Sequence, residues 1–358
     1  MCGWPALGLT ETVPLAGETA SLKKPMKERS RRKLVWPSST LIQYADVPGW
    51  AEKALKETFP KLRVIIARDE AALSREIEDC EILVSWKITS EQLGRCRKLQ
   101  WIHSPAAGVG QLLIPELVAS PIVVTNARSV HAVPVAEHAL ALLLALARRL
   151  PECFRYQAEC RWGQTESWQP DHLPTEINGK TLGLLGLGAI GREVALRAKA
   201  LGMRVVAVKR DPSHGADCAD QVYAPEQLPA VLSQADFLIV AAPDTAATHH
   251  WIGERELRCL QPTACLINVS RGSLVDTEAL TRALQSGKLA GAALDVTDPE
   301  PLPASHHLWK LPNVLIIPHL GGATDRYWPR QLALLQENLQ RYLSGKPLLH
   351  VVDKKKSY

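Results

Sequence analysis

The 358-residue chain contains eight cysteines, but no two of them are spaced as Cys-x-x-Cys. Scattered cysteines do not suit a zinc finger or a small disulfide-bonded domain, and they are typical of buried thiols in a reducing compartment. Two adjacent histidine pairs, His249-His250 and His306-His307, have no partner motif, and we interpret them as loop residues whose rings point in different directions. We therefore expect free cysteines, no metal site and a cytoplasmic location.

The sequence also lacks an apolar run long enough to cross a bilayer. Its longest apolar stretch, residues 135–147, contains Glu137 and His138 near its start and predicts a buried helix. The first residues do not combine a basic segment with an apolar one, so a secretory signal is not expected. No membrane partner is predicted.

Positive charge is concentrated near the two ends of the chain. The formal net charge is +5, yet residues 23–33 alone carry seven Lys or Arg against one Glu, and Lys354–Lys356 add three more. The rest of the chain is close to neutral, whereas a nucleic-acid-binding domain spreads basic residues over a folded face. We predict a disordered basic extension over residues 1–33, a solvated C-terminal tail and no nucleic-acid partner.

Length and the alternation of elements predict two α/β domains. A chain of 358 residues exceeds what one core usually supports. Strand-like runs alternate with helical segments from residue 34 onward, which predicts parallel sheets covered by helices. A helix near 325–343 is expected to return to the first domain. The strand candidates are 62–67, 81–85, 101–103 and 122–125 in the first region, and 181–186, 204–208, 237–242, 264–269, 290–294 and 314–317 in the second.

The most informative motif is the turn Gly-Leu-Gly-Ala-Ile-Gly at residues 186–191. It follows an apolar strand candidate and precedes a run of helix formers. In this context Gly186 permits a tight turn, Gly188 lets the backbone approach a pyrophosphate, and Gly191 permits close helix–strand packing. The N-terminus of the following helix offers unpaired N–H groups to phosphates. The motif predicts a dinucleotide site that includes Gly186, Gly188, Ala189, Ile190 and Gly191.

Three side chains with complementary chemistry follow later strand candidates. Arg271, Glu300 and His319 each come shortly after a strand candidate, where open α/β sheets bind their ligands. An imidazole transfers protons near neutral pH, a neighbouring carboxylate favours its charged form, and a guanidinium binds a carboxylate with two parallel bonds. These roles suit reduction of a keto acid by a hydride from a dinucleotide, with a proton delivered to the carbonyl oxygen.

The glycine turn, Arg271, Glu300 and His319, in this order, resemble the D-isomer-specific 2-hydroxyacid dehydrogenase family over about residues 35–345. The resemblance implies that all three side chains are catalytic. Arg271 would bind and polarise the substrate, Glu300 would orient the ring, and His319 would donate the proton. It also implies that a loop of small residues binds the substrate carboxylate through backbone amides, at Ala107, Gly108 and Val109.

Cofactor preference is predicted from the end of strand candidate 204–208. Lys209 and Arg210 stand where an NAD-specific site usually places an acid, and two cations would attract a 2′-phosphate. NADP is therefore favoured, while Asp211, about twenty residues after the glycines, leaves NAD as the alternative. The resemblance adds contacts of Pro243 and Thr248 on the adenosine side, and of Val269, Arg271 and Asp295 on the nicotinamide side, with Asp295 holding the carboxamide.

The predicted fold is thus α/β, with two Rossmann-like doubly wound parallel-sheet domains and a cleft between them. We assign residues 34–133 plus 320–350 to a flavodoxin-like substrate-binding domain and 134–319 to the dinucleotide-binding domain. The helix from Val135 and the insert with Trp162 and Trp168 match the region through which family members dimerise, which implies a homodimer.

The predicted function is hydride transfer between NADP(H) or NAD(H) and a small 2-keto or D-2-hydroxy acid of the glyoxylate or hydroxypyruvate type. The alternative is a nucleotide-sensing binding protein, like the transcriptional corepressors that share this fold and keep similar residues. Turnover with a keto acid would separate the two functions.

Overall fold

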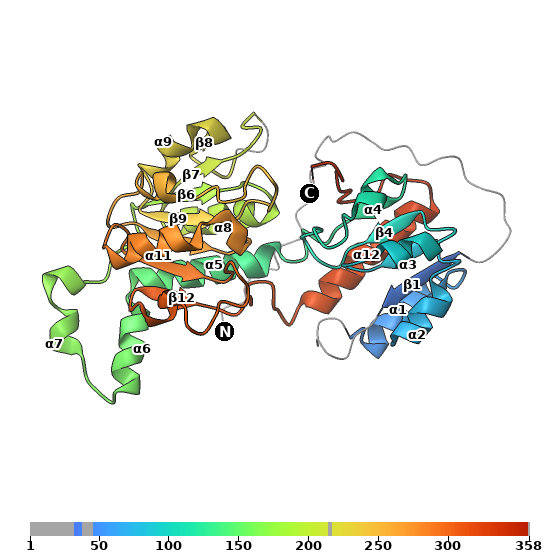
Figure 1. Ribbon diagram of the computed structural model, residues 1–358, viewed down its shortest axis with the longest axis horizontal. Helices are drawn as coiled ribbons and strands as arrows, with labels where there is room; N and C mark the ends of the chain where they lie inside the picture. The colour runs from blue at the N-terminus through green and yellow to red at the C-terminus, as the bar shows by residue number, and fades with distance from the viewer. Residues whose placement is uncertain (1–31, 38–45, 214–216, 357–358) are drawn as a thin grey trace, which may run out of the picture.

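The computed structural model describes residues 32–37, 46–213 and 217–356. They form two lobes, each built on a parallel sheet with helices on its faces (Figure 1). This confirms the predicted fold class. No helix within the described ranges is long and apolar enough to cross a membrane.

The first lobe contains a five-stranded parallel sheet in the order β2-β1-β3-β4-β5. This is the flavodoxin-like order, in which the direction of winding reverses beside β1. Its strands are β1 Lys33–Pro37, β2 Arg63–Ala67, β3 Ile82–Val84, β4 Trp101–His103 and β5 Val123–Thr125. Its helices are α1 Gly49–Thr58, α2 Glu70–Glu76, α3 Ser90–Arg95 and α4 Pro115–Ala119.

The second lobe contains a seven-stranded parallel sheet in the order β12-β11-β10-β9-β6-β7-β8. Winding reverses at β6, which is the strand that leads into the glycine turn. The strands are β6 Thr181–Leu185, β7 Arg204–Val208, β8 Gln221–Tyr223, β9 Phe237–Val240, β10 Cys265–Asn268, β11 Gly291–Leu294 and β12 Val314–Ile316. The helices are α5 Ala132–Ala147, α8 Ala189–Ala200, α9 Leu228–Leu232, α10 Glu254–Leu257 and α11 Thr277–Gln285.

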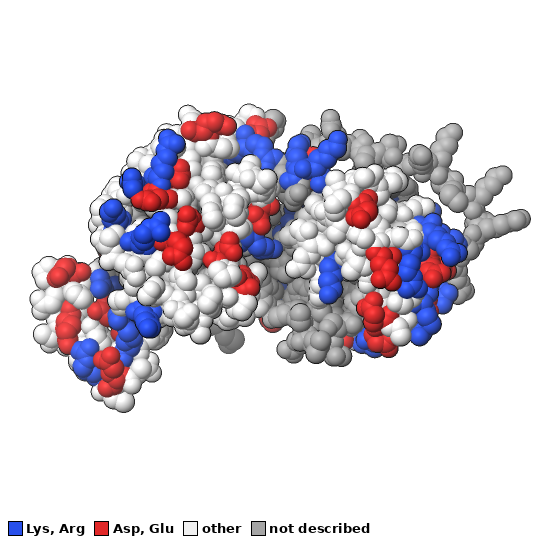
Figure 2. Space-filling model, in the orientation of Figure 1, with Lys and Arg blue, Asp and Glu red and all other residues white. Residues whose placement is uncertain are grey.

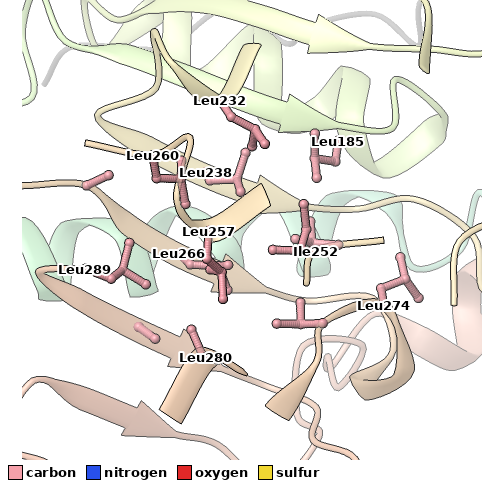
Figure 3. Packing of buried hydrophobic residues seen from close by; sticks show 14 of the residues in the cluster. Leu185, Leu232, Leu238, Ile252, Leu257, Leu260, Leu266, Leu274, Leu280 and Leu289 are labelled. Atoms are coloured by element: carbon pink, nitrogen blue, oxygen red, sulfur yellow. The ribbon is translucent and has the colours of Figure 1, made fainter. Parts of the chain in front are cut away.

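A leucine-rich core holds the strands of the second sheet against their helices (Figure 3). Leu238 and Leu266 from neighbouring strands meet Leu232 of α9 and Leu280 of α11, and the first two of these side chains have no exposed surface. Removing such side chains from water is the main favourable term in folding. The packed core fixes the ends of β6, β9, β10 and β11 relative to one another, and with them the loops that carry the site.

The last helix, α12 (Tyr327–Leu343), returns from the second lobe to the first, as Figure 1 shows. Its Leu335 and Leu339 are fully buried in one cluster with Leu34 and Trp36 of β1. The chain then adds a short bridge between Val351 and Thr125 at the edge of the first sheet. This edge is therefore covered by the C-terminal segment.

The prediction of a solvated C-terminal tail is wrong for Lys354. Its ammonium donates to the carbonyl oxygens of Leu117, Ser120 and Ile122 at 2.9, 2.5 and 3.1 Å. Carbonyls at the end of a helix lack partners within the helix, and a lysine side chain can satisfy them. Charge composition alone does not reveal such an anchor.

The predicted basic extension also ends too late. Residues 1–31 lie outside the described residues, but Lys33 is the first residue of β1 and is only 5% exposed. Its ammonium lies 2.7 Å from Glu76 and 2.5 Å from Asp79. Burial lowers the pKa of Lys33, but the two carboxylates outweigh burial and the net shift is upward. A lysine can begin a buried strand when carboxylates pair with it.

An arm projects from the second lobe, at the lower left of Figure 1. It consists of α6 (Leu150–Ala158), α7 (Gln164–Ser167) and the short 3-10 helix Pro170–His172. The arm exposes three aromatic side chains, Phe154 at 59%, Trp162 at 87% and Trp168 at 73%. Large aromatic surfaces left in water commonly mark an interface.

Candidate active site

The glycine turn connects β6 to α8 at the point where the sheet reverses its winding. Gly186 has φ +98°, and a Cβ there would lie 2.8 Å from the carbonyl oxygen of Ala241. Gly191 packs against the carbonyl oxygen of Gly186. Gly188 differs, because a Cβ there would meet no atom within 4 Å. Close packing within the chain explains why positions 186 and 191 require glycine. At Gly188, by contrast, the open space leaves room for a ligand.

The N-terminus of α8 opens onto that space. Its first-turn N–H groups, which include those of Ala189 and Ile190, have no partners inside a helix. The positive end of the helix dipole lies at the same place. The donors and the open space at Gly188 fit the pyrophosphate of a dinucleotide, and these residues stay predicted cofactor contacts.

Lys209 and Arg210 follow β7 directly beside the turn, since the N–H of Gly186 donates to the carbonyl oxygen of Val208 at 3.0 Å. The acid that could favour NAD is engaged elsewhere in the same loop. The carboxylate of Asp211 accepts the N–H of Ser213 at 3.0 Å and also its hydroxyl. Two cations and a turn-forming acid therefore lie beside the glycine turn, where the ribose of a bound dinucleotide is expected. We call the glycine turn, the N-terminus of α8 and this loop the dinucleotide cradle.

Arg192 is a residue at this site that the sequence reasoning missed. It lies in the first turn of α8 and makes two bonds of 2.8 and 3.2 Å to the carboxylate of Asp217. The Arg192 guanidinium holds the pKa of Asp217 below its usual range, and Lys209 adds a smaller effect in the same direction. Its position directly after Gly191 was the signal that could have identified it.

The loop after β9 lies against the turn, and the loop after β10 lies against the loop after β9, since the hydroxyl of Ser270 donates to the carbonyl oxygen of Ala242. The N–H of Ala241 donates to the carbonyl oxygen of Leu185 at 2.8 Å, so the loop that carries Pro243 begins beside Gly186. Within that loop the hydroxyl of Thr248 donates to the carbonyl oxygen of Pro243 at 2.7 Å. Val269 follows β10 and is 6% exposed. The structure therefore brings these predicted cofactor contacts to one edge of the sheet.

His319 and Glu300 come together as a pair. The Nδ1 atom of His319 lies 2.7 Å from a carboxylate oxygen of Glu300, and the side chains are 44% and 42% exposed. A carboxylate at this distance orients the ring through Nδ1. Because Nδ1 is engaged, Nε2 is the ring nitrogen left to face a substrate.

Arg271 follows β10 and reaches the first lobe. Its guanidinium lies against the loop after β4, so that a Cβ on Gly108 would be 2.5 Å from Nη2. A second guanidinium nitrogen donates to the carbonyl oxygen of Ser270 at 2.7 Å. Glycine at 108 thus allows close approach of a cation to a loop backbone, an arrangement that suits an anionic substrate.

The other two residues predicted in that loop have structural contacts. The carbonyl oxygen of Ala107 accepts a bond of 2.8 Å from the amide of Asn126, and the side chain of Val109 is 2% exposed. Their amides stay predicted substrate contacts. Asn126, which the sequence reasoning missed, holds the loop in place from the segment after β5.

His131 is a second residue that sequence reasoning missed. Its Nδ1 lies 3.3 Å from the carbonyl oxygen of Gly322, and its ring lies 5.6 Å from that of Tyr327. Burial lowers the pKa of His131, with a further contribution from Arg271. His131 therefore joins the start of α5 to the turn after His319. No local motif reports a contact between segments this far apart in the chain.

Asp295 lies behind the turn that carries His319. Its side chain is 3% exposed, and its two oxygens accept the N–H groups of Leu320 and Gly321 at 2.7 and 3.0 Å. The predicted contact with a nicotinamide carboxamide stays a prediction, but these bonds give the carboxylate a different task.

Within the described ranges, no group of three or more His, Cys, Asp or Glu residues could hold a metal ion. One detail of the histidine argument is wrong. The rings of His249 and His250 do not point apart but stack, with centroids 4.1 Å apart and an interplanar angle of 17°. His250 adopts φ +48°, which turns its side chain back onto its neighbour.

The comparisons with known proteins agree with this geometry. Residues 140–321 match the family described as D-isomer specific 2-hydroxyacid dehydrogenase, NAD binding domain. A glyoxylate reductase from Thermococcus litoralis is 37% identical over 288 residues, which are 78% of this chain and 85% of the relative. A D-3-phosphoglycerate dehydrogenase from Synechocystis sp. is 35% identical over 75% of this chain and 47% of its own length.

Solved structures agree as well. A 2-hydroxyacid dehydrogenase family protein from Aeromonas salmonicida has a TM-score of 0.78 and 31% identity, covering 91% of this chain and 100% of that one. An NADPH-dependent glyoxylate/hydroxypyruvate reductase from Sinorhizobium meliloti, in complex with NADP and sulfate, has a TM-score of 0.77 and 25% identity over the same shares. The chain belongs to the D-isomer specific 2-hydroxyacid dehydrogenase family and is an NAD(P)-dependent oxidoreductase.

Proposed function

We propose that this enzyme uses NADPH to reduce a small 2-keto acid of the glyoxylate or hydroxypyruvate type to the D-2-hydroxy acid. The observation that carries the proposal is the His319–Glu300 pair at 2.7 Å together with Arg271, which lies against Gly108. A proton donor, its orienting carboxylate and a carboxylate-binding cation are the groups that this reaction requires. Relatives named glyoxylate reductase, at 37% and 35% identity, support the substrate class.

The chain's own residues have distinct tasks in this reaction. When bound, NADPH supplies the hydride. The guanidinium of Arg271 binds the substrate carboxylate and polarises the neighbouring carbonyl, and the backbone at Gly108 and Val109 fixes the other side of the same carboxylate. The Nε2 atom of His319 holds the proton that the carbonyl oxygen receives. Glu300 keeps the ring oriented through Nδ1.

Parallel assays with glyoxylate, hydroxypyruvate, pyruvate and phenylpyruvate test the proposal, with either NADPH or NADH as reductant. We expect turnover of the two small acids with NADPH, and slower turnover with NADH. Tight cofactor binding without turnover of any keto acid would instead support the corepressor-like alternative. The relatives and structures named above are reductases and dehydrogenases, so no observation favours that alternative.

Cofactor preference tests the ribose side of the cradle. The double substitution Lys209→Asp and Arg210→Asp replaces two cations by carboxylates that repel a 2′-phosphate. We expect the ratio of kcat/KM for NADPH to that for NADH to fall by at least about 100-fold, the lower limit for the loss of two charge-assisted hydrogen bonds. Lys288→Asp, a matched charge reversal outside the cradle, should leave the ratio unchanged. An unchanged ratio in the double variant would contradict the assignment.

We also propose a homodimer formed through the arm. Trp162 and Trp168, at 87% and 73% exposed, provide the apolar surface that a second copy would cover. We expect Trp162→Asp with Trp168→Asp to convert a dimer to a monomer in light scattering after gel filtration. Trp50→Asp, at a tryptophan of 50% exposure on the first lobe, serves as the control. A dimer that persists in the double variant would place the interface elsewhere.

We propose a cytoplasmic location because the seven cysteines in the described part of the chain are free thiols.

We propose that residues 34–133 plus 320–350 bind the substrate and that 134–319 bind the dinucleotide. Over the face shown in Figure 2, basic and acidic side chains are interspersed on both lobes, which agrees with a small-molecule substrate.

A further inference from the structure

Two cysteine side chains of the first lobe lie in contact with each other. Cys80 stands just before β3, Cys96 caps the end of α3, and their side chains form a thiol–thiol hydrogen bond. Cys80 has no exposed surface, whereas Cys96 is half-buried and packs against the same apolar cluster. Both are free thiols, so the two sulfur atoms are placed to react with each other.

The backbone around the two thiols is held in place. The N–H of Arg97 donates to the carbonyl oxygen of Glu78 at 2.8 Å. The guanidinium of Arg95 donates to the carbonyl oxygen of Ser74 at 2.6 Å and lies 3.2 Å from a carboxylate oxygen of Glu78. These contacts keep the end of α3 against the segment before β3. Formation of an S–S bond of about 2.05 Å therefore requires only a small approach of the two sulfur atoms.

The two thiols differ in access and in acidity. Cys80 donates to the sulfur of Cys96, and this bond, with a smaller contribution from Arg95, holds the pKa of the Cys96 thiol below its usual range although burial opposes it. The same bond and burial raise the pKa of Cys80. The thiolate is the form that reacts with peroxides. Cys96 is therefore the thiol that reacts first, and Cys80 is the neighbour that reacts with its product.

We propose that Cys80 and Cys96 are a site of reversible oxidation, at which a peroxide converts the two thiols to a disulfide within the chain. The thiolate of Cys96 attacks one oxygen of the peroxide, the O–O bond breaks, and a sulfenic acid forms. The thiol of Cys80 then attacks that sulfur, the S–O bond breaks, and water leaves. The two thiols lose two electrons and two protons, and hydrogen peroxide becomes two molecules of water.

The product is one that a reducing compartment can reverse. A dithiol reductant cleaves the disulfide by thiol–disulfide exchange, whereas a sulfenic acid that meets no thiol is oxidised further to a sulfinic acid, which thiols do not reduce. Cys80 and Cys96 precede the parallel neighbours β3 and β4, so they lie at the edge of the sheet opposite the loop after β4. The oxidation site is therefore separate from the candidate active site.

Treatment of the full chain with hydrogen peroxide, followed by alkylation of the remaining thiols, tests the proposal. Digestion after lysine places the two cysteines in separate peptides, residues 62–87 and 88–98. We expect mass spectrometry to find these peptides linked after oxidation and separate again after reduction with dithiothreitol. The linked form should contain most of Cys96 at a peroxide dose that oxidises less than about a tenth of Cys259.

Two variants and a matched control separate the steps. In Cys80→Ala we expect Cys96 to gain oxygen and reach the sulfinic acid, which dithiothreitol does not reverse. In Cys96→Ala, Cys80 should stay reduced. Cys259→Ala is the control and should form the link as the wild type does. Cys259 is also half-buried and donates to the carbonyl oxygen of Arg255 at 3.5 Å, as Cys96 does to that of Gln92 at 3.2 Å, but it lies in the second lobe.

Two results would overturn the proposal. The first is that peptides 62–87 and 88–98 of the wild type stay unlinked at every peroxide dose that oxidises Cys259. The second is that sulfinic acid forms at Cys96 as fast in the wild type as in Cys80→Ala, which would show that Cys80 does not intercept the sulfenic acid. Neither measurement uses a substrate, so both are independent of the proposed function.

Discussion

His319→Gln is expected to lower kcat for keto-acid reduction about a thousandfold while the Kd of NADPH stays close to that of the wild type. Glutamine can still bond to Glu300, but it cannot deliver a proton to the carbonyl oxygen, and a positioned general acid contributes roughly 10²- to 10⁴-fold. The dinucleotide cradle lies at Gly186, Gly188 and the start of α8, so its donors are not altered by the change.

Steady-state kinetics at saturating NADPH and fluorescence titration of the nucleotide measure the two expected effects. His307→Gln is the matched control, because His307 is exposed in the short 3-10 helix His307–Lys310 and belongs to no part of the proposed site. If His319→Gln kept more than about a tenth of the wild-type kcat, the proton would have to come from another group.

The ten strands that sequence reasoning listed are all present, and each end lies within two residues of its predicted place. Strands β4 and β7 have the predicted bounds, Trp101–His103 and Arg204–Val208. Strand β8, Gln221–Tyr223, was missed because it lies at the edge of the sheet, has three residues and keeps none of them buried. A strand that buries little has no hydrophobic pattern to report.

The residues of the candidate site also divide into those that the sequence predicted and those that it did not. Arg271, Glu300 and His319 were predictable because each follows a parallel strand, and the ends of parallel strands meet at one edge of a sheet. His131 was not predictable in this way. It contacts Gly322 across a sequence separation of 191 residues, and only the return of α12 to the first lobe brings these segments together.

For Asp295, the sequence predicted a functional carboxylate but not the contacts that this carboxylate makes. Its place after β11 predicts a functional carboxylate, and the structure keeps it at the site. Its burial and its two backbone partners depend on how the turn at residues 319–321 folds over it, which no spacing within the sequence expresses.

Arg271→Lys is expected to lower kcat/KM for a 2-keto acid about 100-fold, with much of the loss in KM. Lysine keeps the positive charge, but its ammonium cannot make the two parallel bonds by which a guanidinium binds a carboxylate. One charge-assisted hydrogen bond contributes about 1.5–3 kcal/mol, which corresponds to roughly 10- to 200-fold in binding. The shorter reach of lysine toward Gly108 adds to the loss, because the guanidinium of the wild type touches that loop.

A comparison of two substrates gives a second readout for Arg271→Lys, one that a loss of folding would not produce. Since Arg271 binds the substrate carboxylate, a carbonyl substrate without one, such as a simple aldehyde, should lose much less rate than glyoxylate on the change from wild type to Arg271→Lys. Arg282→Lys, at an exposed arginine of α11 that lies 3.6 Å from Glu254, should behave as wild type with both substrates. If Arg271→Lys reduced glyoxylate as efficiently as the wild type, carboxylate binding would have to depend on the backbone at residues 107–109 alone.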